Sequence, residues 1–410
     1  MASRGSQGRI LIIVENLPVP FDRRVWSEAT TLRAAGYEVS VICPKRKDAA
    51  ASHEVIDGIH IYRHPLPIEA NGALGYALEY ATALFFEFVL SLKVLWQRGF
   101  DVLQACNPPD TIFLIGGFYK LFGKRFVFDQ HDINPELYEA KFGRRDFFWR
   151  MMIWLERLSF RTADRSIATN ESYRRIAIER GGMAPDRVHV VRSGPNLKRV
   201  RTVPPDDGRW KQGRRFLVGY VGVIGHQEGL DLLLDSVEHV VRRLERSDIQ
   251  FVVCGDGPAL AEIRSNAGQR GLEAFVTFTG RCSDDDLFSA LSTAEVCVNP
   301  DRPCAMNDKS TMNKVMEYMA LGKPQVQYDL AEGRFSAGES SLYATDPDDF
   351  GDKVVALLDD PEQRARMGQL GRERVETVLA WSHEAPKLLA LYDELLSTPQ
   401  KGSSVDLPVT

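Results

Sequence analysis

Residues 307–324 (NDKSTMNKVMEYMALGKP) combine residue types and spacings that suit a bound nucleotide. Taken as a helix from about Thr311, this segment places Lys314 and Glu317 three residues apart on one face. The Glu317 carboxylate can accept hydrogen bonds from two adjacent ribose hydroxyls. Lys314, near a helix N-terminus, suits a diphosphate. The alternative is a solvated ion pair between the two side chains, which contributes little stability.

The remainder of the segment predicts how this helix is held. Asp308 or Ser310 is expected to cap its N-terminus, and Gly322 with Pro324 to end it. Ser310 and Thr311, at its start, are also candidates for contact with the nucleotide. Apolar side chains recur at helical spacing and predict a buried stripe: Met312, Val315, Met316 and Met319.

A glycine-rich loop, residues 222–229 (GVIGHQEG), lies between a strand-like run and an amphipathic helical run. Gly222 and Gly225 can let backbone N–H groups approach a phosphate at the helix start. Close packing selects glycine as well, so the loop alone is weak support. We predict phosphate contact here.

Two further loops follow predicted strands in the same half of the chain. Gly255, in residues 254–258 (CGDGP), fits either a tight turn that needs a positive φ or direct ligand contact. Arg281 and Cys282 lie in a loop that can hold a nucleobase through main-chain groups. Both loops belong to the predicted nucleotide site.

His131 is the candidate from the first half of the chain. It comes just after a predicted strand, with Asp129 and Asp132 beside it (FVFDQHD). A lone histidine is more often a satisfied structural group, but the position at a strand end favours a role in the site. No pattern typical of a metal site or of a hydrolase is present, so we expect neither.

The elements that must position these residues alternate between strand and helix in two series. An α/β fold of two doubly wound, Rossmann-like domains is therefore predicted, with the ligand cleft between them. The first domain covers residues 9–200, a linker 201–213, and the second domain 214–383. A final helix, 384–398, is a candidate to pack back on the first domain, and the ends, 1–8 and 399–410, are expected to be disordered. Strands are predicted at 9–14, 39–42, 101–105, 125–129, 165–168, 188–191, 215–221, 250–254, 275–279, 296–299 and 325–329.

Charge and cysteine content narrow the class of protein. The net charge of −5 combines +6 for residues 1–200 (28 Lys and Arg, 22 Asp and Glu) with −11 for residues 201–410 (23 against 34). A basic first half favours an anionic neighbour such as a membrane surface or a phosphorylated carrier, although surface charge also drifts freely. The acidic balance disfavours nucleic acid. The six cysteines lack C-x-x-C spacing, and we expect reduced core thiols in a cytoplasmic protein.

Two aromatic-rich segments bear on membrane contact. The apolar run 77–96 contains Glu79, Glu87 and Lys93, which favours a buried or surface-lying helix over a membrane span. Residues 146–160 (DFFWRMMIWLERLSF) mix aromatic and basic side chains, and fit either core packing or contact with a bilayer surface.

Taken together, several of these segments resemble the family-four retaining glycosyltransferases of the GT-B fold, over nearly the whole chain. The resemblance implies sugar transfer from a UDP- or GDP-linked donor, with no metal or other cofactor. The second domain would hold the nucleotide sugar, and the first a carbohydrate or lipid-linked acceptor. The similar segments are RVWSEATTLRAAGYEVSVICP, FDQHD, YVGVIGHQEGLDLLL, VVCGDGP, VTFTGR, STMNKVMEYMALGKP and AWSHEAPKLLALYDELL.

The resemblance also implies roles for individual residues. Glu317 matches the second Glu of the family's E-x7-E motif, which binds ribose, and Gly225 matches the glycine of the phosphate loop. His131 matches the histidine that contacts the donor sugar, and Arg281 with Cys282 matches the nucleobase edge. The acceptor is assigned to the first domain, through Asp22, Arg23, Arg24 and His131.

The sequence departs from the family pattern at two positions. Lys309 stands where the first Glu of E-x7-E is expected, so contact with the donor sugar is missing or comes from Asp308. Glu228 stands where the phosphate loop often has Lys, and we expect Lys314 to supply that charge. His131, Lys314 and Asp308 are thus the candidate catalytic residues. The STMNK-x-x-EYMA form resembles a bacterial subgroup of surface-polysaccharide assembly.

The predicted function is a retaining, metal-independent glycosyltransferase of polysaccharide or glycoconjugate biosynthesis. It would be cytoplasmic, with peripheral contact to the inner membrane face as an option. Two alternatives stay open: a non-catalytic partner that binds nucleotide sugar, and a nucleotide-sugar epimerase on the same fold.

Overall fold

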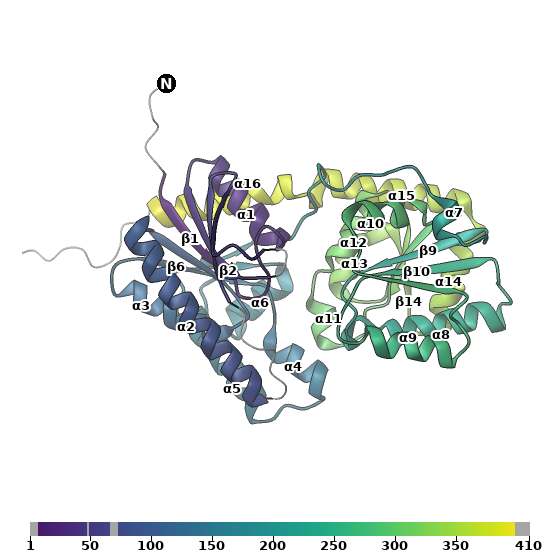
Figure 1. Cartoon of the computed structure of the whole chain (residues 1–410), viewed down its shortest axis with the longest axis horizontal. Coiled ribbons are helices and arrows are strands. Elements are labelled where there is room, and N and C mark those ends of the chain that lie inside the picture. Colours follow the sequence, from purple (N-terminus) through teal and green to yellow (C-terminus); the bar gives the residue numbers. More distant parts are fainter. Residues whose placement is uncertain (1–6, 47–48, 66–72, 398–410) are drawn as a thin grey trace, which may run out of the picture. The chain divides into compact units, whose positions relative to one another are not determined.

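A computed structural model describes residues 7–46, 49–65 and 73–397 of the chain (Figure 1). The expected disordered ends, 1–8 and 399–410, lie almost entirely outside the described residues. The chain forms two compact units, each described here by itself. The first comprises Met1–Glu139, Arg144–Arg192 and Ala385–Thr410, and the second Ala140–Gly143 and Ser193–Glu384.

The first unit is built on one eight-stranded sheet in the order β3-β4-β2-β1-β5-β6-β7-β8. All neighbours pair in parallel except β3 and β4, which form an antiparallel hairpin. β1, β2 and β5 are short, buried apolar runs, as expected for strands that helices cover on both faces. The strands are β1 (Arg9–Ile13), β2 (Glu38–Pro44), β3 (His53–Ile56), β4 (Ile59–His64), β5 (Val102–Cys106), β6 (Arg125–Gln130), β7 (Arg165–Ala168) and β8 (Val188–Val190).

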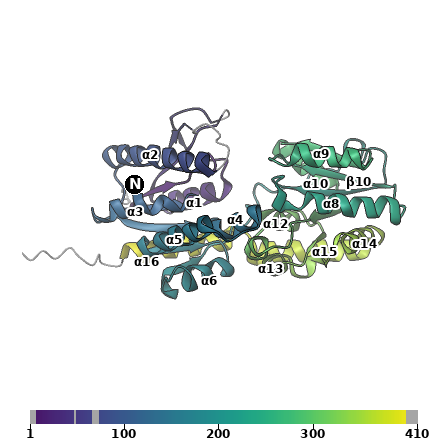
Figure 2. The same ribbon diagram turned by 90° about the horizontal axis from the view of Figure 1, so that it is seen from below.

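Helices connect these strands, and α2, α3 and α5 follow one another across one side of the unit (Figure 2). Ring contact between Phe88 of α2 and Phe118 of α3, with centroids 5.0 Å apart, agrees with that arrangement. α3 also packs against α5. The α-helices are α1 (Arg23–Ala34), α2 (Ala73–Gln97), α3 (Phe113–Lys120), α4 (Asn134–Phe142), α5 (Phe147–Thr162) and α6 (Glu171–Glu179).

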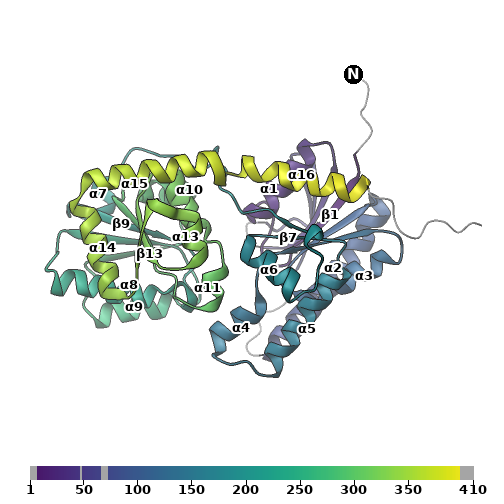
Figure 3. The same ribbon diagram turned by 180° about the vertical axis from the view of Figure 1, so that it is seen from behind.

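The helix α16 (Trp381–Ser397) begins in the second unit and continues into the first at Ala385. In the first unit its Tyr392 hydroxyl donates to Gln104 Oε1 on β5. The Tyr37 hydroxyl donates to Asp393 Oδ1 at 3.0 Å. Leu388, Leu391 and Leu395 are buried on the same helix. The last described helix is therefore part of the first unit's core (Figure 3).

The second unit is a six-stranded, wholly parallel sheet in the order β11-β10-β9-β12-β13-β14. Two apolar clusters cover its faces, one with Val218 and Val253, the other with Leu217 and Val252. Neighbouring strand residues thus point to opposite faces. The strands are β9 (Phe216–Val221), β10 (Ile249–Cys254), β11 (Val276–Gly280), β12 (Val296–Asn299), β13 (Gln325–Tyr328) and β14 (Ser341–Ala344).

The helices of this unit include one inside the expected linker, residues 201–213, where Trp210 is buried and donates to Ser289 Oγ at 2.9 Å. The α-helices are α7 (Asp207–Trp210), α8 (Leu230–Glu238), α9 (Leu260–Gln269), α10 (Asp284–Thr293), α11 (Ala305–Lys309), α12 (Asn313–Ala320), α13 (Ala331–Ala337), α14 (Pro347–Asp359) and α15 (Pro361–Arg374). A mostly parallel sheet in the first unit and a wholly parallel sheet in the second, each covered by helices, confirm the predicted α/β class.

The cap predicted for α12 is wrong: Asp308 and Ser310 belong to α11 and its end, and α12 starts after Met312 with no side-chain cap. Among the described residues, no helix is long and apolar enough to cross a membrane. The six cysteines are free thiols, four of them buried.

Candidate functional site

The glycine-rich loop after β9 presents the first part of the site in the second unit. The Gly225 N–H donates to Glu228 Oε2 at 3.0 Å, so a carboxylate of the chain accepts the amide predicted for phosphate. Gly229 closes the loop with φ 63°, and a Cβ there would lie 2.1 Å from the Pro300 carbonyl oxygen. The loop therefore begins α8 in a conformation that only glycine fits.

The loop after β10 packs directly on the first loop. A Cβ on Gly255 would lie 1.8 Å from the Gly222 carbonyl oxygen. Two amides of the first loop donate to the second: Gly222 N to Cys254 O and Ile224 N to Asp256 O, both at 3.1 Å. Backbone packing thus accounts for glycine at 255 without a ligand. Gly222, Gly225 and Gly255 lie in one paired-loop structure at the carboxyl edge of the sheet.

Lys314 lies near the first loop, close enough to feel the charge of Glu228, and only 11% of its side chain is exposed. Its Nζ lies 2.6 Å from Asp301 Oδ1 and 5.0 Å from the ring centre of Tyr220. The alternative of a solvated ion pair with Glu317 does not hold for Lys314, because its close partner is Asp301. Burial opposes the charge, but Asp301 and the neighbouring Glu228 raise the pKa of Lys314. The lysine stays charged.

Two carboxyl groups share this surrounding. Burial raises the pKa of Asp301 despite Lys314, and burial likewise raises the pKa of Glu228. Sequence reasoning missed Asp301. It could have been found, because it follows the carboxyl end of a predicted strand, and ligands of parallel sheets bind at that edge.

Glu317 has a different partner, which sequence reasoning also missed. Arg199 Nη2 donates to Glu317 Oε1 at 2.5 Å, while its Nη1 lies 3.0 Å from Asp284 Oδ2 at the start of α10. Arg199 comes from the segment before β9, 118 residues from Glu317. Nothing in the local sequence joins these residues.

The other donor-site candidates are placed less centrally. Asp308 Oδ1 accepts the Ala331 N–H at 2.8 Å, and Ser310 Oγ donates to the Met306 carbonyl at 2.9 Å. Thr311 is half-buried in the turn between α11 and α12. Asp308 thus holds the start of α13, a structural task that the sequence did not suggest.

The predicted base-binding edge follows β11. Arg281 is exposed and Cys282 is half-buried. A hydrogen bond with Cys254 lowers the pKa of the Cys282 thiol to about 7. The Gly255 N–H donates to the Gly280 carbonyl at 3.0 Å, which fixes this edge to the paired loops.

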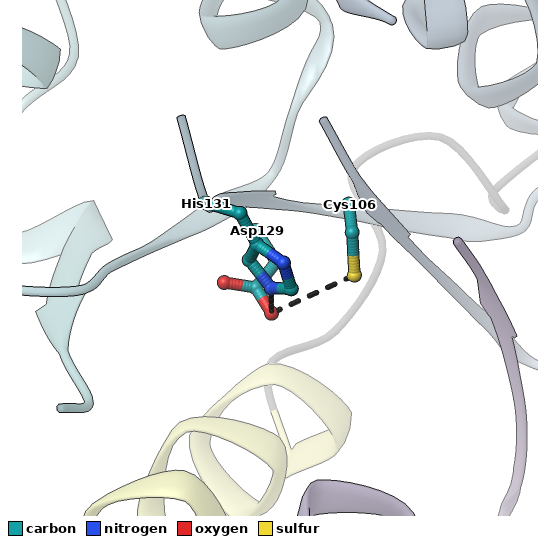
Figure 4. Close-up of side chains that lie close together, drawn as sticks. All are labelled: Cys106, Asp129 and His131. Carbon is teal, nitrogen blue, oxygen red and sulfur yellow. Dashed lines mark hydrogen bonds and ion pairs between the residues drawn. The ribbon is translucent and has the colours of Figure 1, made fainter. Parts of the chain in front are cut away.

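In the first unit, His131 lies just past β6 within a buried ionic cluster (Figure 4). Its Nε2 is 2.9 Å from Asp129 Oδ2 and 3.0 Å from Arg24 Nε. Burial opposes protonation of the ring, but the Asp129 carboxylate outweighs it and raises the pKa of His131. Asn107 Oδ1 accepts the His131 N–H at 2.7 Å and so holds the backbone.

Arg24 neutralises this cluster. Its Nη2 lies 3.0 Å from Asp129 Oδ1 and 3.1 Å from Glu28 Oε1, and its side chain is only 8% exposed. The guanidinium also donates to the Val191 carbonyl at 2.9 Å. Burial and the nearby Asp129 charge raise the pKa of Glu28 to about 8.

Of the four acceptor candidates, the structure brings Arg24 and His131 into contact. Asp22 and Arg23 have other surroundings. Asp22 caps α1, where its Oδ1 accepts the Val25 N–H at 3.0 Å. Arg23 is exposed. Arg24 is 8% exposed and pairs with Asp129 and Glu28, a setting that the sequence did not reveal.

Three ligand atoms of Cys106, Asp129 and His131 lie within 4.8 Å of one another, a spacing that could hold a metal ion. However, Arg24 already donates to both Asp129 and His131. A guanidinium in this position supplies the balancing positive charge and repels a second cation. The burial-raised pKa of Cys106 also disfavours the thiolate that metals prefer.

Comparison with protein families agrees with this two-part arrangement. Residues 22–199 match the model described as Glycosyltransferase Family 4, and residues 215–360 match Glycosyl transferases group 1. The kanosaminyltransferase (alpha-D) of Streptomyces kanamyceticus is 29% identical over 185 residues, 44% of this chain and 46% of that protein. The O-antigen chain mannosyltransferase C of Escherichia coli is 26% identical over 220 residues, 52% and 56%. The chain spans about half the length of these relatives.

Solved structures share the fold at low sequence identity. Sucrose-phosphate synthase of Thermosynechococcus elongatus superposes with a TM-score of 0.77 at 20% identity, over 95% of this chain and 99% of that one. The Anabaena protein HepE, in complex with UDP and glucose, superposes with a TM-score of 0.70 at 13% identity, over 94% and 100%.

Proposed function

This chain belongs to the family-four-like glycosyltransferases of the bacterial polysaccharide kind, and from that membership we propose that it transfers a sugar from a nucleoside diphosphate sugar to a carbohydrate or lipid-linked acceptor. The reaction would serve polysaccharide or glycoconjugate biosynthesis. The bond from the anomeric carbon to the diphosphate breaks and a bond to the acceptor oxygen forms, with retained configuration. The acceptor hydroxyl gives up its proton to the departing diphosphate.

One observation carries the proposal: the buried Lys314 lies beside the phosphate-type loop in the second unit. A charged lysine and the backbone amides of a helix start are the groups that stabilise a leaving diphosphate without a metal. HepE binds UDP on the same fold, so UDP is the first donor base to test and GDP the second. Glu317 would hold the ribose, and the edge at Arg281 and Cys282 the base.

The remaining roles follow from the geometry of each residue. His131, with its raised pKa, can donate a hydrogen bond to a sugar hydroxyl, provided that the bound ligand competes with Asp129. Asp308 follows Asn307, whose side-chain amide donates to the Gln227 carbonyl of the first loop at 2.9 Å. We propose Asp308 as a contact to the donor sugar. Acceptor binding is assigned to the first unit, where Arg23 is exposed.

We propose that the enzyme acts in the cytoplasm, and at the inner face of the membrane when its acceptor is lipid-linked. The alternative of a non-catalytic nucleotide-sugar-binding partner has one supporting feature, the Glu228 carboxylate on the Gly225 amide. Donor-dependent transfer to an acceptor separates the two. Release of an isomerised sugar nucleotide without acceptor would instead indicate an epimerase.

Removal of the Lys314 charge tests the proposal. Lys314→Met alone would leave the Asp301 carboxylate without its ion-pair partner. The test therefore uses the double variant Lys314→Met with Asp301→Asn, in which both side chains are uncharged. We expect turnover to fall by about 10²–10³-fold, the usual cost of one oxyanion donor. Stabilisation by UDP in a thermal-shift assay should fall as well.

Two controls sharpen that experiment. Lys353→Met removes a lysine that pairs with Asp349 on the surface of α14, and should leave turnover unchanged. Glu228→Gln keeps an oxygen for the Gly225 amide but removes a negative charge, and should tighten UDP binding. Unchanged turnover in the folded double variant would refute the role of Lys314.

A further inference from the structure

Exposed apolar side chains gather on three helices of the first unit. Of the 17 large apolar side chains exposed in the described part of the chain, 11 lie on α2, on α5, or on α3 and the two residues after it. Scattered exposed apolar residues are normal, but such a concentration marks an interaction site. We call this set the apolar face: Phe85, Val89, Leu92, Trp96, Leu114, Leu121, Phe122, Phe147, Phe148, Met151 and Trp154.

The three helices form one continuous surface. The ring of Phe88 on α2 meets that of Phe118 on α3 edge to face, and α3 packs against α5. Figure 2 shows the three helices in this order along one side of the unit. The residues of the apolar face therefore lie on one layer of adjacent helices.

On α5, cationic side chains share the apolar stripe. Phe147, Met151 and Trp154 are exposed at 72%, 37% and 59%, spaced i, i+4 and i+7. Arg150, Arg157 and Arg161 are exposed at the interleaved positions i+3, i+10 and i+14. These six residues occupy one side of the helix.

The acidic residue of α5 is turned away from this side. Glu156 is buried and binds Arg180 Nη2 at 2.6 Å. Within α5, which the structure describes in full, every exposed charge is thus an arginine. On α2, Lys93 and Arg98 just after it are likewise exposed, whereas Glu87 is buried.

We propose that the apolar face docks on a bilayer that carries anionic phospholipids. Exposed Phe and Trp would enter the boundary between headgroups and acyl chains, while the arginines contact lipid phosphates. The charge pattern decides between occupants, because a second copy of this face would bring arginine against arginine. The docking would place the enzyme beside lipid-linked acceptors, a link that rests on the proposed function, whereas vesicle binding can be measured without any transfer reaction.

Vesicle sedimentation of the full chain tests this docking. The probes are phosphatidylcholine vesicles with and without phosphatidylglycerol. We expect binding to the anionic vesicles, weakened by salt because the lipid charge is then screened. The variant Arg150→Gln with Arg157→Gln should bind about 30-fold more weakly, at roughly 1 kcal/mol per arginine. Trp154→Ser with Phe147→Ser should reduce binding further.

The matched control is Phe335→Ser, which removes an exposed aromatic of the second unit and should leave binding unchanged. Because all substituted side chains are exposed, unchanged melting of each variant confirms its fold. The proposal is wrong if the wild-type protein does not sediment with anionic vesicles. It is also wrong if the protein binds both vesicle types equally at all salt concentrations. Self-association through the face in place of vesicle binding, detected by light scattering, would also contradict the proposal.

Discussion

His131 is held by two groups that make opposite demands on one nitrogen atom. Arg24 Nε–H can only donate to Nε2, whereas the Asp129 carboxylate can only accept from it. When Nε2 carries a proton, it can donate to Asp129, but it can no longer accept from Arg24. When Nε2 is unprotonated, it can accept from Arg24, but it has no proton to donate to Asp129. The raised pKa of His131 shows that Asp129 prevails.

Asp129→Asn should therefore move the pKa of His131 from above its ordinary value to below it. Burial and Arg24 both disfavour the charged ring, and without Asp129 they outweigh the smaller opposing effect of Asp22. Titration of the His131 ring signals by NMR measures this shift. Asp164→Asn, which removes a carboxylate bound to Lys120, is the control and should leave His131 unchanged.

Stability should follow with a defined sign. In the wild type, the raised pKa gives a stabilisation that is complete below the unfolded pKa of about 6.5 and is lost as pH rises through the folded value. In Asp129→Asn, the lowered pKa makes stability fall as pH drops below about 6.5 instead. Urea unfolding across this range would contradict the assignment if both proteins showed the same pH slope.

At the scale of elements, the two loops of the second unit behave as one structure. Gly255 packs on the backbone of Gly222, so the second loop has no room for a side chain at this contact. The paired loops then hold the start of α8 against β12 through Gly229 and Pro300. Their rigidity sets where a diphosphate could meet the Gly225 amide.

Gly255→Ala should destabilise the second unit by about 3 kcal/mol or more, because its Cβ would meet the Gly222 carbonyl at 1.8 Å. Gly271→Ala is the matched control. It adds a Cβ at a positive φ of 66° with nothing within 4 Å, and should cost only about 1–2 kcal/mol of backbone strain. Equal losses in denaturant unfolding would show that the loop contact is unimportant.

Most strands could be predicted from short apolar runs, because burial on both faces leaves that signal. The hairpin of β3 and β4 was missed, although its turn at Asp57 and Gly58, with φ 52° and 77°, has the D-G signature. β14 was missed too, being short and only partly apolar.

The candidate site could be predicted only in part. Lys314 and Glu317 were found from local spacing, but their partners Asp301 and Arg199 are supplied by the fold from other segments. Burial of Arg24 likewise depends on β6 and α1 meeting, which one sequence does not reveal.

The whole molecule consists of two units whose boundaries do not follow the sequence. The first unit takes its residues from both ends of the chain, and the second lies between them. The contribution of α16 is structural, because Tyr392 and Asp393 bind Gln104 and Tyr37 inside the first unit.

Deletion of residues 385–410 should therefore destabilise the first unit selectively. Hydrogen exchange measured by mass spectrometry should accelerate in β5, whose Gln104 loses its hydrogen bond from Tyr392, while β9 and β10 stay protected. The substitution Glu394→Ala, on an exposed part of α16, is the control. Equal acceleration in both units would show that they unfold together.

This interrupted first unit has a consequence for synthesis on the ribosome. After Arg192 emerges, 192 further residues, 193–384, must be made before the nascent chain supplies Ala385. At about 5–20 residues per second, the wait is about 10–40 s. During that time the second unit can complete its sheet, while Gln104 and Tyr37 await their partners. We therefore expect residues 1–192 of the first unit to depend on chaperones for longer than the second unit does.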